Sequence, residues 1–316
     1  MRKEIEIVCG GIVVADVMMR PVDRLPRRGT LLYVSGLELH LGGCAANTAV
    51  ALARLGAGVA LVTRIGKDDF GRFLESALER EGIDCSLVRE TIRAGTSATG
   101  VAVSSDGERS FIHNVGSNAE LRASDFSIES FPRARHLHLG GALLNPRLEG
   151  RPLGAIMKKA KAAGLTTSLD TVWSPRKNSL GFHEQALPHT DILFANEREG
   201  KLLTGRRTPG TMAKFLLERG VGTVVIKQGE RGGTVFTAHG EFSTPALRAK
   251  CVDTTGAGDA FVGGFLYSFL CGGSLEEAAR LGSAAGALCV TKLGAIAGLG
   301  NLSETKRFMA RAKTLK

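Results

Sequence analysis

The sequence predicts an α/β fold, in which helices flank a doubly wound, mostly parallel sheet and a second, smaller sheet lies apart from it. The first observation is that strand-like and helix-like runs alternate after residue 135, with strands expected at 136–139, 165–170, 191–195 and 222–227. Such alternation favours a parallel sheet with helices on both faces. The second observation is that the strand-like runs around 12–39 and 96–114 lack helices of their own. We expect these runs to form the smaller sheet.

The individual elements follow from local signals. Asp106 and Gly107 separate the alternating runs 96–104 and 109–114, and an Asp-Gly pair in this setting is a strong hairpin signal. Hydrophobic periodicity and glycine stops indicate the other elements. These are strands at 4–9, 12–19, 30–39 and 59–65, and helices at 48–56, 72–81, 148–163 and 275–292. We expect residues 1–316 to form a single domain.

The composition is that of an ordinary globular protein. The 316 residues are 43% hydrophobic and 23% charged, and such a chain can bury a core without help from disulfides. The six cysteines are scattered without a CxxC pair, which favours thiols in a reducing compartment, the cytoplasm, over a disulfide framework or a zinc site. We expect no membrane span, because the chain lacks an apolar run of about 18 residues, and no signal peptide, because the N-terminus leads directly into a strand.

The chain is basic, with a formal net charge of +10 at pH 7. The positive residues are not gathered in one block, and aromatic residues make up only 5% of the chain, too few for base-stacking platforms. We therefore expect no nucleic-acid partner. The same charge is consistent with attraction of a small anionic ligand such as a nucleotide.

The most informative stretch is residues 253–261, which read DTTGAGDAF. Small residues before an apolar, helix-compatible segment leave the amides of Gly256, Ala257 and Gly258 open to one anion at a helix N-terminus, where the helix dipole adds positive charge. Asp259 stands where a base would take a proton from an attacking hydroxyl if the anion is a phosphoryl group. The alternative is a tight turn with Asp259 as a helix cap.

A second glycine pair, Gly42 and Gly43, precedes the helix expected at 48–56. The pair allows a ligand to approach the backbone, and the nearby Asn47 amide can both donate to and accept from hydroxyl groups. Asp16 is an acid within an apolar strand, which suggests either a water-facing position or a carboxylate that accepts hydrogen bonds from ligand hydroxyls. A GxGxxG motif is absent, which counts against a dinucleotide fold.

Three further groups allow two interpretations each. Asn196 and Glu199 share one helix face and suit either a capping box or a polar ligand site. Asp170 ends a predicted strand, where it can contact a ligand or cap the next element. His136 and His138 alternate on one strand face, where hydrogen bonding and metal binding are both possible, without an evident third ligand.

The two glycine motifs together carry a family resemblance. Residues 42–56 follow the pattern G-G-x-x-x-N-x-A-x-x-x-x-x-L-G, and residues 253–259 follow D-T-x-G-A-G-D, in the order found in ribokinase-like (PfkB) carbohydrate kinases. The step at 66–71, G-x-D-x-x-G, also matches, so the resemblance extends from Gly10 to about Gly298. It implies an ATP-dependent kinase that phosphorylates a primary hydroxyl of a sugar-like substrate. The smaller sheet, within 12–40 and 96–118, is then a lid over that substrate.

The resemblance also implies roles for single residues. The implied catalytic group is Asp259 with an anion hole of Gly256, Ala257 and Gly258, and the implied substrate contacts are Asp16, Gly42, Gly43 and Asn47. Beside ATP would lie Asn196, Lys227, Gly229 and Gly232, the last three from a strand and glycine-rich turn that otherwise suggest only a hairpin. Glu199 would hold magnesium through water. Asp253 and Thr255 match a monovalent cation site of the ribokinase branch, a possible site for potassium, in which Gly298 replaces a serine ligand.

Several alternatives remain open. A nucleoside kinase needs a slot for a base, and the lid has few aromatic residues (Tyr33 and Phe111), which favours a sugar. A non-catalytic sensor would be expected to lose the base or the anion hole, and both are present. Cys44 replaces a lysine of ribokinase, so ribose is not the default; fructose, 2-keto-3-deoxygluconate and other acidic sugars stay open. Arg93 or Arg109 could meet a carboxylate or form surface ion pairs. We expect a homodimer through the lid, because exposed sheet edges favour pairing.

Overall fold

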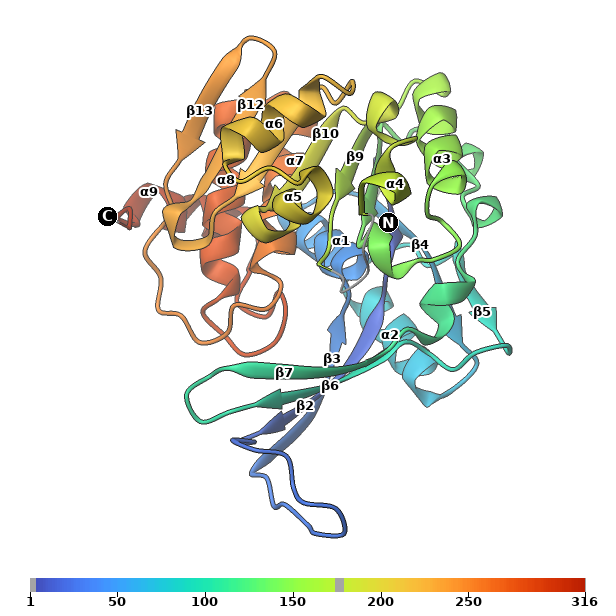
Figure 1. Ribbon diagram of the computed structural model, residues 1–316, viewed down its shortest axis with the longest axis vertical. Coiled ribbons are helices and arrows are strands. Elements are labelled where there is room, and N and C mark those ends of the chain that lie inside the picture. Colours follow the sequence, from blue (N-terminus) through green and yellow to red (C-terminus); the bar gives the residue numbers. More distant parts are fainter. Residues whose placement is uncertain (1–3, 174–178, 316) are drawn as a thin grey trace.

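A computed structural model describes residues 4–173 and 179–315, and it contains two sheets of unequal size (Figure 1). Among these residues, the larger sheet has the strand order β13-β12-β11-β10-β9-β8-β1-β4-β5, and the smaller has the order β3-β2-β6-β7. The strands of the large sheet are β1 (Ile7–Gly11), β4 (Val59–Gly66), β5 (Val88–Thr91), β8 (His136–Gly140), β9 (Thr166–Asp170), β10 (Ile192–Asn196), β11 (Thr223–Lys227), β12 (Gly233–Thr237) and β13 (Gly240–Thr244). Those of the small sheet are β2 (Val14–Arg20), β3 (Gly36–Gly42), β6 (Ala98–Val103) and β7 (Arg109–Asn114).

The large sheet confirms the predicted doubly wound, mostly parallel architecture. The strands from β5 through β11 pair in parallel, and only β12 and β13 are antiparallel. Helices cover both of its faces (Figure 1). They are α1 (Cys44–Leu55), α2 (Asp69–Arg80), α3 (Arg151–Ala162), α4 (Ser179–His183), α5 (Glu197–Thr204), α6 (Pro209–Leu217), α7 (Ala257–Leu270), α8 (Leu275–Cys289) and α9 (Leu302–Arg311).

Alternation along the strands divides the core into two layers. In β10, Phe194 packs into the layer that contains α1, α7 and α8, whereas its neighbours Leu193 and Ala195 pack into the layer with α3, α5 and α6. Phe194 meets Phe265 of α7 edge to face, with ring centroids 5.2 Å apart. Because both faces of β10 are buried, its sequence is apolar from Ile192 to Ala195 rather than an alternation of polar and apolar residues.

The small sheet projects from one side of the large one (Figure 1). Its β6–β7 hairpin forms around the predicted Asp106-Gly107 turn, with Gly107 at φ 87°. Pairing in register places side chains on two faces. The inner face carries Asp16, Met18, Thr99, Val101, Val103, Arg109, Phe111 and His113, and the outer face carries Leu37, Leu39 and Ile112.

Some element boundaries differ from the prediction. The strand expected at 30–39 lies at Gly36–Gly42, because the ladder with β2 ends at the Arg20–Gly36 pair and residues 30–35 have no partner strand. Helix α3 begins at Arg151 rather than at 148. Strands β5, β12 and β13 were not predicted, since short runs leave little periodicity to read. Within the described ranges, no helix is both long and apolar enough to cross a membrane.

Candidate active site

The glycine-rich motif forms the start of α7. Gly256 is the N-cap residue in the left-handed region at φ 75°, and a Cβ there would lie 3.0 Å from the side chain of Ala295. The cap has no side-chain hydrogen bond. Asp259 therefore does not cap the helix. The Ala257 amide donates to the Thr254 carbonyl oxygen at 3.3 Å, whereas the amides of Gly256 and Gly258 have no partner among the described residues and are available to an anion.

Asp259 is held by α1 from the other motif. Its Oδ2 accepts a hydrogen bond of 2.7 Å from Asn47 Nδ2, across 212 residues of sequence. The helices approach closely because Gly263 faces Ala51, where an added Cβ would come within 2.5 Å. Burial raises the pKa of Asp259 to about 6, although Asn47 and Lys227 oppose this shift. The carboxylate is thus oriented and has the raised proton affinity of a general base.

Three adjacent parallel strands end in polar side chains at the same edge. Asp170 ends β9, Asn196 ends β10 and Lys227 ends β11. Lys227 Nζ donates a 2.7 Å hydrogen bond to Asp170 Oδ1, and these side chains are only 13% and 2% exposed. Burial acts to lower the pKa of Lys227, but the carboxylates of Asp170 and Glu199 outweigh it and raise that pKa. The ion pair was not predicted, because 57 residues separate its members.

Asn196 and Glu199 form the capping box of α5. Asn196 Oδ1 accepts from the Glu199 amide at 2.9 Å, and Glu199 Oε2 accepts from the Asn196 amide at 2.8 Å. Thr171 Oγ1 also donates to this oxygen at 3.2 Å. Among the described residues, the second oxygen, Oε1, receives no hydrogen bond. The capping box does not exclude a ligand role for Glu199. The residue is only 9% exposed, but it lines the cavity described next.

These groups surround one cavity with a volume of about 240 Å³. The residues that line it share a position at the carboxyl edge of the sheet or at a helix N-terminus: Cys44, Asp170, Thr171, Val172, Asn196, Glu199, Lys227, Gly229, Gly258 and Asp259. Six of them were predicted site residues. Gly232 lies outside this lining; its Cβ would come within 2.0 Å of the Thr244 carbonyl oxygen, so it allows close packing of the turn.

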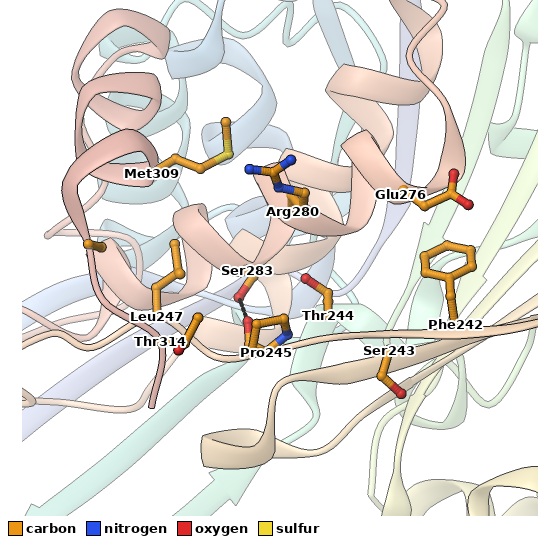
Figure 2. A pocket seen from close by; sticks show the side chains of 11 residues that line it. Phe242, Ser243, Thr244, Pro245, Leu247, Glu276, Arg280, Ser283, Met309 and Thr314 are labelled. Carbon is orange, nitrogen blue, oxygen red and sulfur yellow. Dashed lines mark hydrogen bonds between the residues drawn. The ribbon is translucent and has the colours of Figure 1, made fainter. Parts of the chain in front are cut away.

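A larger cavity of about 410 Å³ lies between β13, α8 and α9 (Figure 2). Ser283 Oγ donates a 2.7 Å hydrogen bond to the Pro245 carbonyl oxygen at its wall, and Arg280 and Glu276 are its charged side chains. In the described parts of the chain, the two cavities share no lining residue. The smaller cavity is the better candidate for catalysis, because it combines a buried carboxylate, a lysine and a helix N-terminus.

Asp16 lies on the inner face of the small sheet. Burial raises its pKa to about 6, and a hydrogen bond from Thr99 opposes this shift. Thr99 Oγ1 is itself 3.0 Å from His113 Nδ1. A Cβ at Gly42 would fall 2.0 Å from Asp16 Oδ2, so a larger residue there would force the Asp16 side chain to move. Asp16 is half-buried in the apolar strand β2, where it belongs to a polar group with Thr99 and His113 on this face.

Asp253 and Thr255 stand just before α7. Asp253 Oδ1 accepts from the Thr255 amide at 2.9 Å and from Thr255 Oγ1 at 2.7 Å, and Oδ2 accepts from the Gly294 amide at 2.8 Å. Arg109 of β7 also forms an ion pair with Asp253 and donates to Thr254 Oγ1. Arg109 was expected to meet a substrate carboxylate or to form a surface ion pair. Its side chain is only 18% exposed, and the ion pair that it forms joins the small sheet to the segment before α7.

Hydrogen bonds occupy three of the four ring nitrogens of the two strand histidines, and His138 Nε2 is buried without a partner among the described residues. His136 contacts Thr166 and Ser168 with both ring nitrogens, each at 2.7 Å, and His138 Nδ1 lies 2.8 Å from Ser168 Oγ. Burial lowers the pKa of both rings, so they are neutral. No group of three potential metal ligands occurs among the residues that the structure describes.

A comparison with protein families decides the identity. A family model described as "pfkB family carbohydrate kinase" matches residues 5–301. The chain belongs to the PfkB family of carbohydrate kinases. Its two glycine motifs, which carried the resemblance, both lie within the match.

PfkB relatives of known name span almost the whole chain. The ATP-dependent ribose-1-phosphate kinase of Halopiger xanaduensis is 32% identical over 293 residues, 92% of this chain and 94% of that protein. The ribokinase of Haemophilus influenzae is 30% identical over 318 residues, 99% of this chain and 100% of that protein. The structure of Arabidopsis thaliana ribokinase complexed with ribose and ATP has a TM-score of 0.84 at 27% identity, and the match covers 97% of this chain and 99% of that one. The PfkB protein described here is therefore a sugar kinase.

Proposed function

We propose that this PfkB kinase transfers the terminal phosphoryl group of ATP to a primary hydroxyl of a sugar or sugar-like molecule. The observation that carries the proposal is the Asp259 carboxylate, buried at the N-terminus of α7, with its pKa raised to about 6 and its orientation set by Asn47. A base with this pKa is largely ionised at neutral pH and can accept the hydroxyl proton as the oxygen attacks.

The remaining groups of the cavity suit phosphoryl transfer. In our proposal the amides of Gly256, Ala257 and Gly258 stabilise negative charge on the transferred group. Lys227 supports this, because a Cβ at Gly258 would lie only 3.4 Å from its ammonium, which places the positive charge beside the anion hole. Gly229 lines the same cavity, consistent with a phosphate chain that passes the 229–232 turn.

Magnesium fits the donor set of this cavity. Oxygen ligands and retained waters are what Mg²⁺ prefers, and Glu199 presents a carboxylate to the cavity while Asn196 fixes its backbone position. We propose that Glu199 holds the ion through water, with Asn196 beside the nucleotide. Bound magnesium would neutralise charge on the phosphates of ATP.

The substrate is proposed to lie between the small sheet and α1. Asp16 contributes an acceptor from the sheet, and Gly42 and Gly43 let a ligand approach the backbone at the start of α1. Asn47, which donates to Asp259, retains an amide oxygen for a substrate hydroxyl. In this proposal the small sheet acts as a lid, and residues 1–316 form one domain.

The outer face of the small sheet supports a dimer. Leu37 of β3 and Ile112 of β7, on the two edge strands, are 68% and 65% exposed there, and Leu39 of β3 lies on the same face. Exposed apolar groups on a sheet commonly mark an interaction surface, so we propose a homodimer through the lids. The six cysteines are free thiols, which supports a cytoplasmic location.

A sugar remains a better substrate class than a nucleoside. Of the two aromatic residues expected near the substrate, Tyr33 lies outside the strands and is 87% exposed, and Phe111 alone lies on the inner face. A single edge aromatic is a poor slot for a base. A non-catalytic sensor is disfavoured, because Asp259 and the anion hole are both in place.

The test is ADP release with ATP, magnesium and a panel of neutral sugars, sugar acids and nucleosides, on the wild type and Asp259→Asn. We expect release with one substrate class in the wild type and its loss in the variant. Release by both proteins at equal rates would refute Asp259 as the base, and wild-type turnover of nucleosides alone would replace the sugar with the nucleoside alternative.

A further inference from the structure

Asp253 is a meeting point of three segments. Its side chain is 2% exposed, and its two oxygens accept hydrogen bonds from Thr255 and Gly294. Arg109 of the small sheet is the remaining donor to this carboxylate. Burial acts to raise the pKa of Asp253, but these hydrogen bonds outweigh it and hold the pKa below its usual range. The carboxylate is therefore ionised, and the positive partner of this buried charge is Arg109.

Arg109 links the small sheet to the segment before α7. It begins β7, on the inner face of the small sheet, and its two guanidinium nitrogens bond to Asp253 and to Thr254. Its side chain is only 18% exposed. These two contacts immediately precede the anion hole at Gly256–Gly258, so the small sheet holds the segment that binds the transferred phosphoryl group in our proposal.

A monovalent cation, which the resemblance to ribokinase suggested, does not fit these residues. The carboxylate that would bind the cation already accepts three backbone or hydroxyl donors and a guanidinium, whose charge repels a second cation nearby. Position 298 offers no side-chain ligand: a Cβ at Gly298 would lie 2.1 Å from the Leu288 carbonyl oxygen and 2.5 Å from Thr291 Oγ1. A serine there would not be accommodated without movement of the backbone.

We propose that the Arg109 guanidinium takes the place of the monovalent cation and makes this kinase independent of potassium. Arg109 is then a positioning residue: it neutralises Asp253, which orders Thr255 and thereby the anion hole. The inference rests on the proposed kinase reaction. It predicts that the closed small sheet and an ordered anion hole occur together, because one side chain joins them.

The experiment compares wild type, Arg109→Ala, Arg109→Lys and the control Arg20→Met. Arg20 is an arginine of the same sheet whose ion pair with Glu38 is exposed, so its loss removes a sheet arginine without touching Asp253. Turnover is measured with tetramethylammonium chloride as the only monovalent salt, and then with potassium or guanidinium chloride at equal ionic strength. Melting temperature in each salt provides a readout that does not need a substrate.

We expect the turnover of the wild type and of Arg20→Met to change less than about twofold between the salts. Their melting temperatures should be nearly the same in each salt. Arg109→Ala should lose about tenfold or more in kcat, with the KM for ATP nearly unchanged, because an anion-hole element is disordered rather than a nucleotide contact removed. Potassium or guanidinium should restore part of that loss. Arg109→Lys should retain more activity than Arg109→Ala, but less than the wild type, because an ammonium lacks the two-pronged geometry.

Strong activation or thermal stabilisation of the wild type by potassium would overturn the inference, and so would full activity of a folded Arg109→Ala without added cation. These outcomes are separate from a failure of the kinase proposal. If the substrate panel gives no turnover, a wild-type melting temperature that rises with potassium still refutes the inference, and a potassium-dependent rise confined to Arg109→Ala still supports it.

Discussion

The two sheets of this protein are built by different rules. In the large sheet, central strands such as β1 and β8 are buried on both faces, and two extensive apolar layers cover them. In the small sheet, the apolar cluster is limited to Met18, Val101 and Val103 with Leu293 packed against it, and its outer face is largely exposed. The large sheet can therefore hold groups rigidly, whereas the small sheet depends on other surfaces for its stability.

The proposed division of labour follows this difference. Asp259, Lys227 and Glu199 belong to the large sheet and its helices, where packing fixes their positions. Asp16 belongs to the small sheet, where recognition tolerates movement. We therefore expect changes near the large sheet to lower kcat. Changes in the small sheet should affect substrate KM or assembly, except at Arg109, whose contacts with Asp253 and Thr254 reach the segment before α7.

The largest effect is expected for Asp259→Asn, which tests whether the groups held by the large sheet and its helices set kcat. It should lower kcat by about a thousandfold or more, because the base is lost while its shape is kept. It should also raise the free energy of unfolding at pH 8 by about 1 to 3 kcal/mol, because a buried charge is removed. Steady-state kinetics and chemical denaturation measure both effects.

Asp69→Asn is the matched control, since Asp69 also lies in the first turn of a helix but its side chain is 91% exposed. It should leave both quantities nearly unchanged. An Asp259→Asn protein that is folded and retains wild-type kcat would refute the mechanism.

The next largest effect should come from the small sheet. Asp16→Ala is expected to raise the KM for the sugar by about a hundredfold while the KM for ATP stays within about twofold, because only a substrate acceptor is lost. Initial rates with each substrate varied in turn separate the two constants. An equal rise in both, or a loss confined to kcat, would remove the distinction between the two sheets.

The pH dependence should reflect the raised pKa of Asp259, about 6. The ionised form is the base, so kcat should fall about tenfold per pH unit well below 6 and level off above it. Stability has the opposite sign: the contribution of Asp259 is fully present below its ordinary pKa of 3.8 and is lost as pH rises through about 6. A kcat profile that is flat between pH 5 and 8 would contradict this assignment.

The smallest effect on chemistry, and a large one on assembly, is expected at the outer face of the small sheet. Leu37→Glu with Ile112→Glu should convert a dimer to a monomer in sedimentation, because two charges would face their own copies across the interface. We expect kcat to change by less than about threefold. A wild type that sediments as a monomer would end the dimer proposal.

Local signals predicted much of the fold and part of the site. The small-residue turn before α7, the Asn196–Glu199 capping box and the Asp106-Gly107 hairpin each depend on a few neighbouring residues, and the sequence alone indicated all three. The alternation of strands and helices was sufficient for the large sheet. The boundaries of β3, and the existence of β12 and β13, depended on which strands found partners.

The sequence by itself determined most of the elements and the glycine positions at which backbone can meet a ligand, because those properties depend on local conformation and residue size. Only the tertiary structure decided the partners: Asn47 on Asp259, Lys227 on Asp170 and Arg109 on Asp253 join residues 212, 57 and 144 positions apart. The physical reason is that the charge state and orientation of a buried group depend on the side chains that packing brings beside it. A pattern along the chain does not show which distant residues become neighbours.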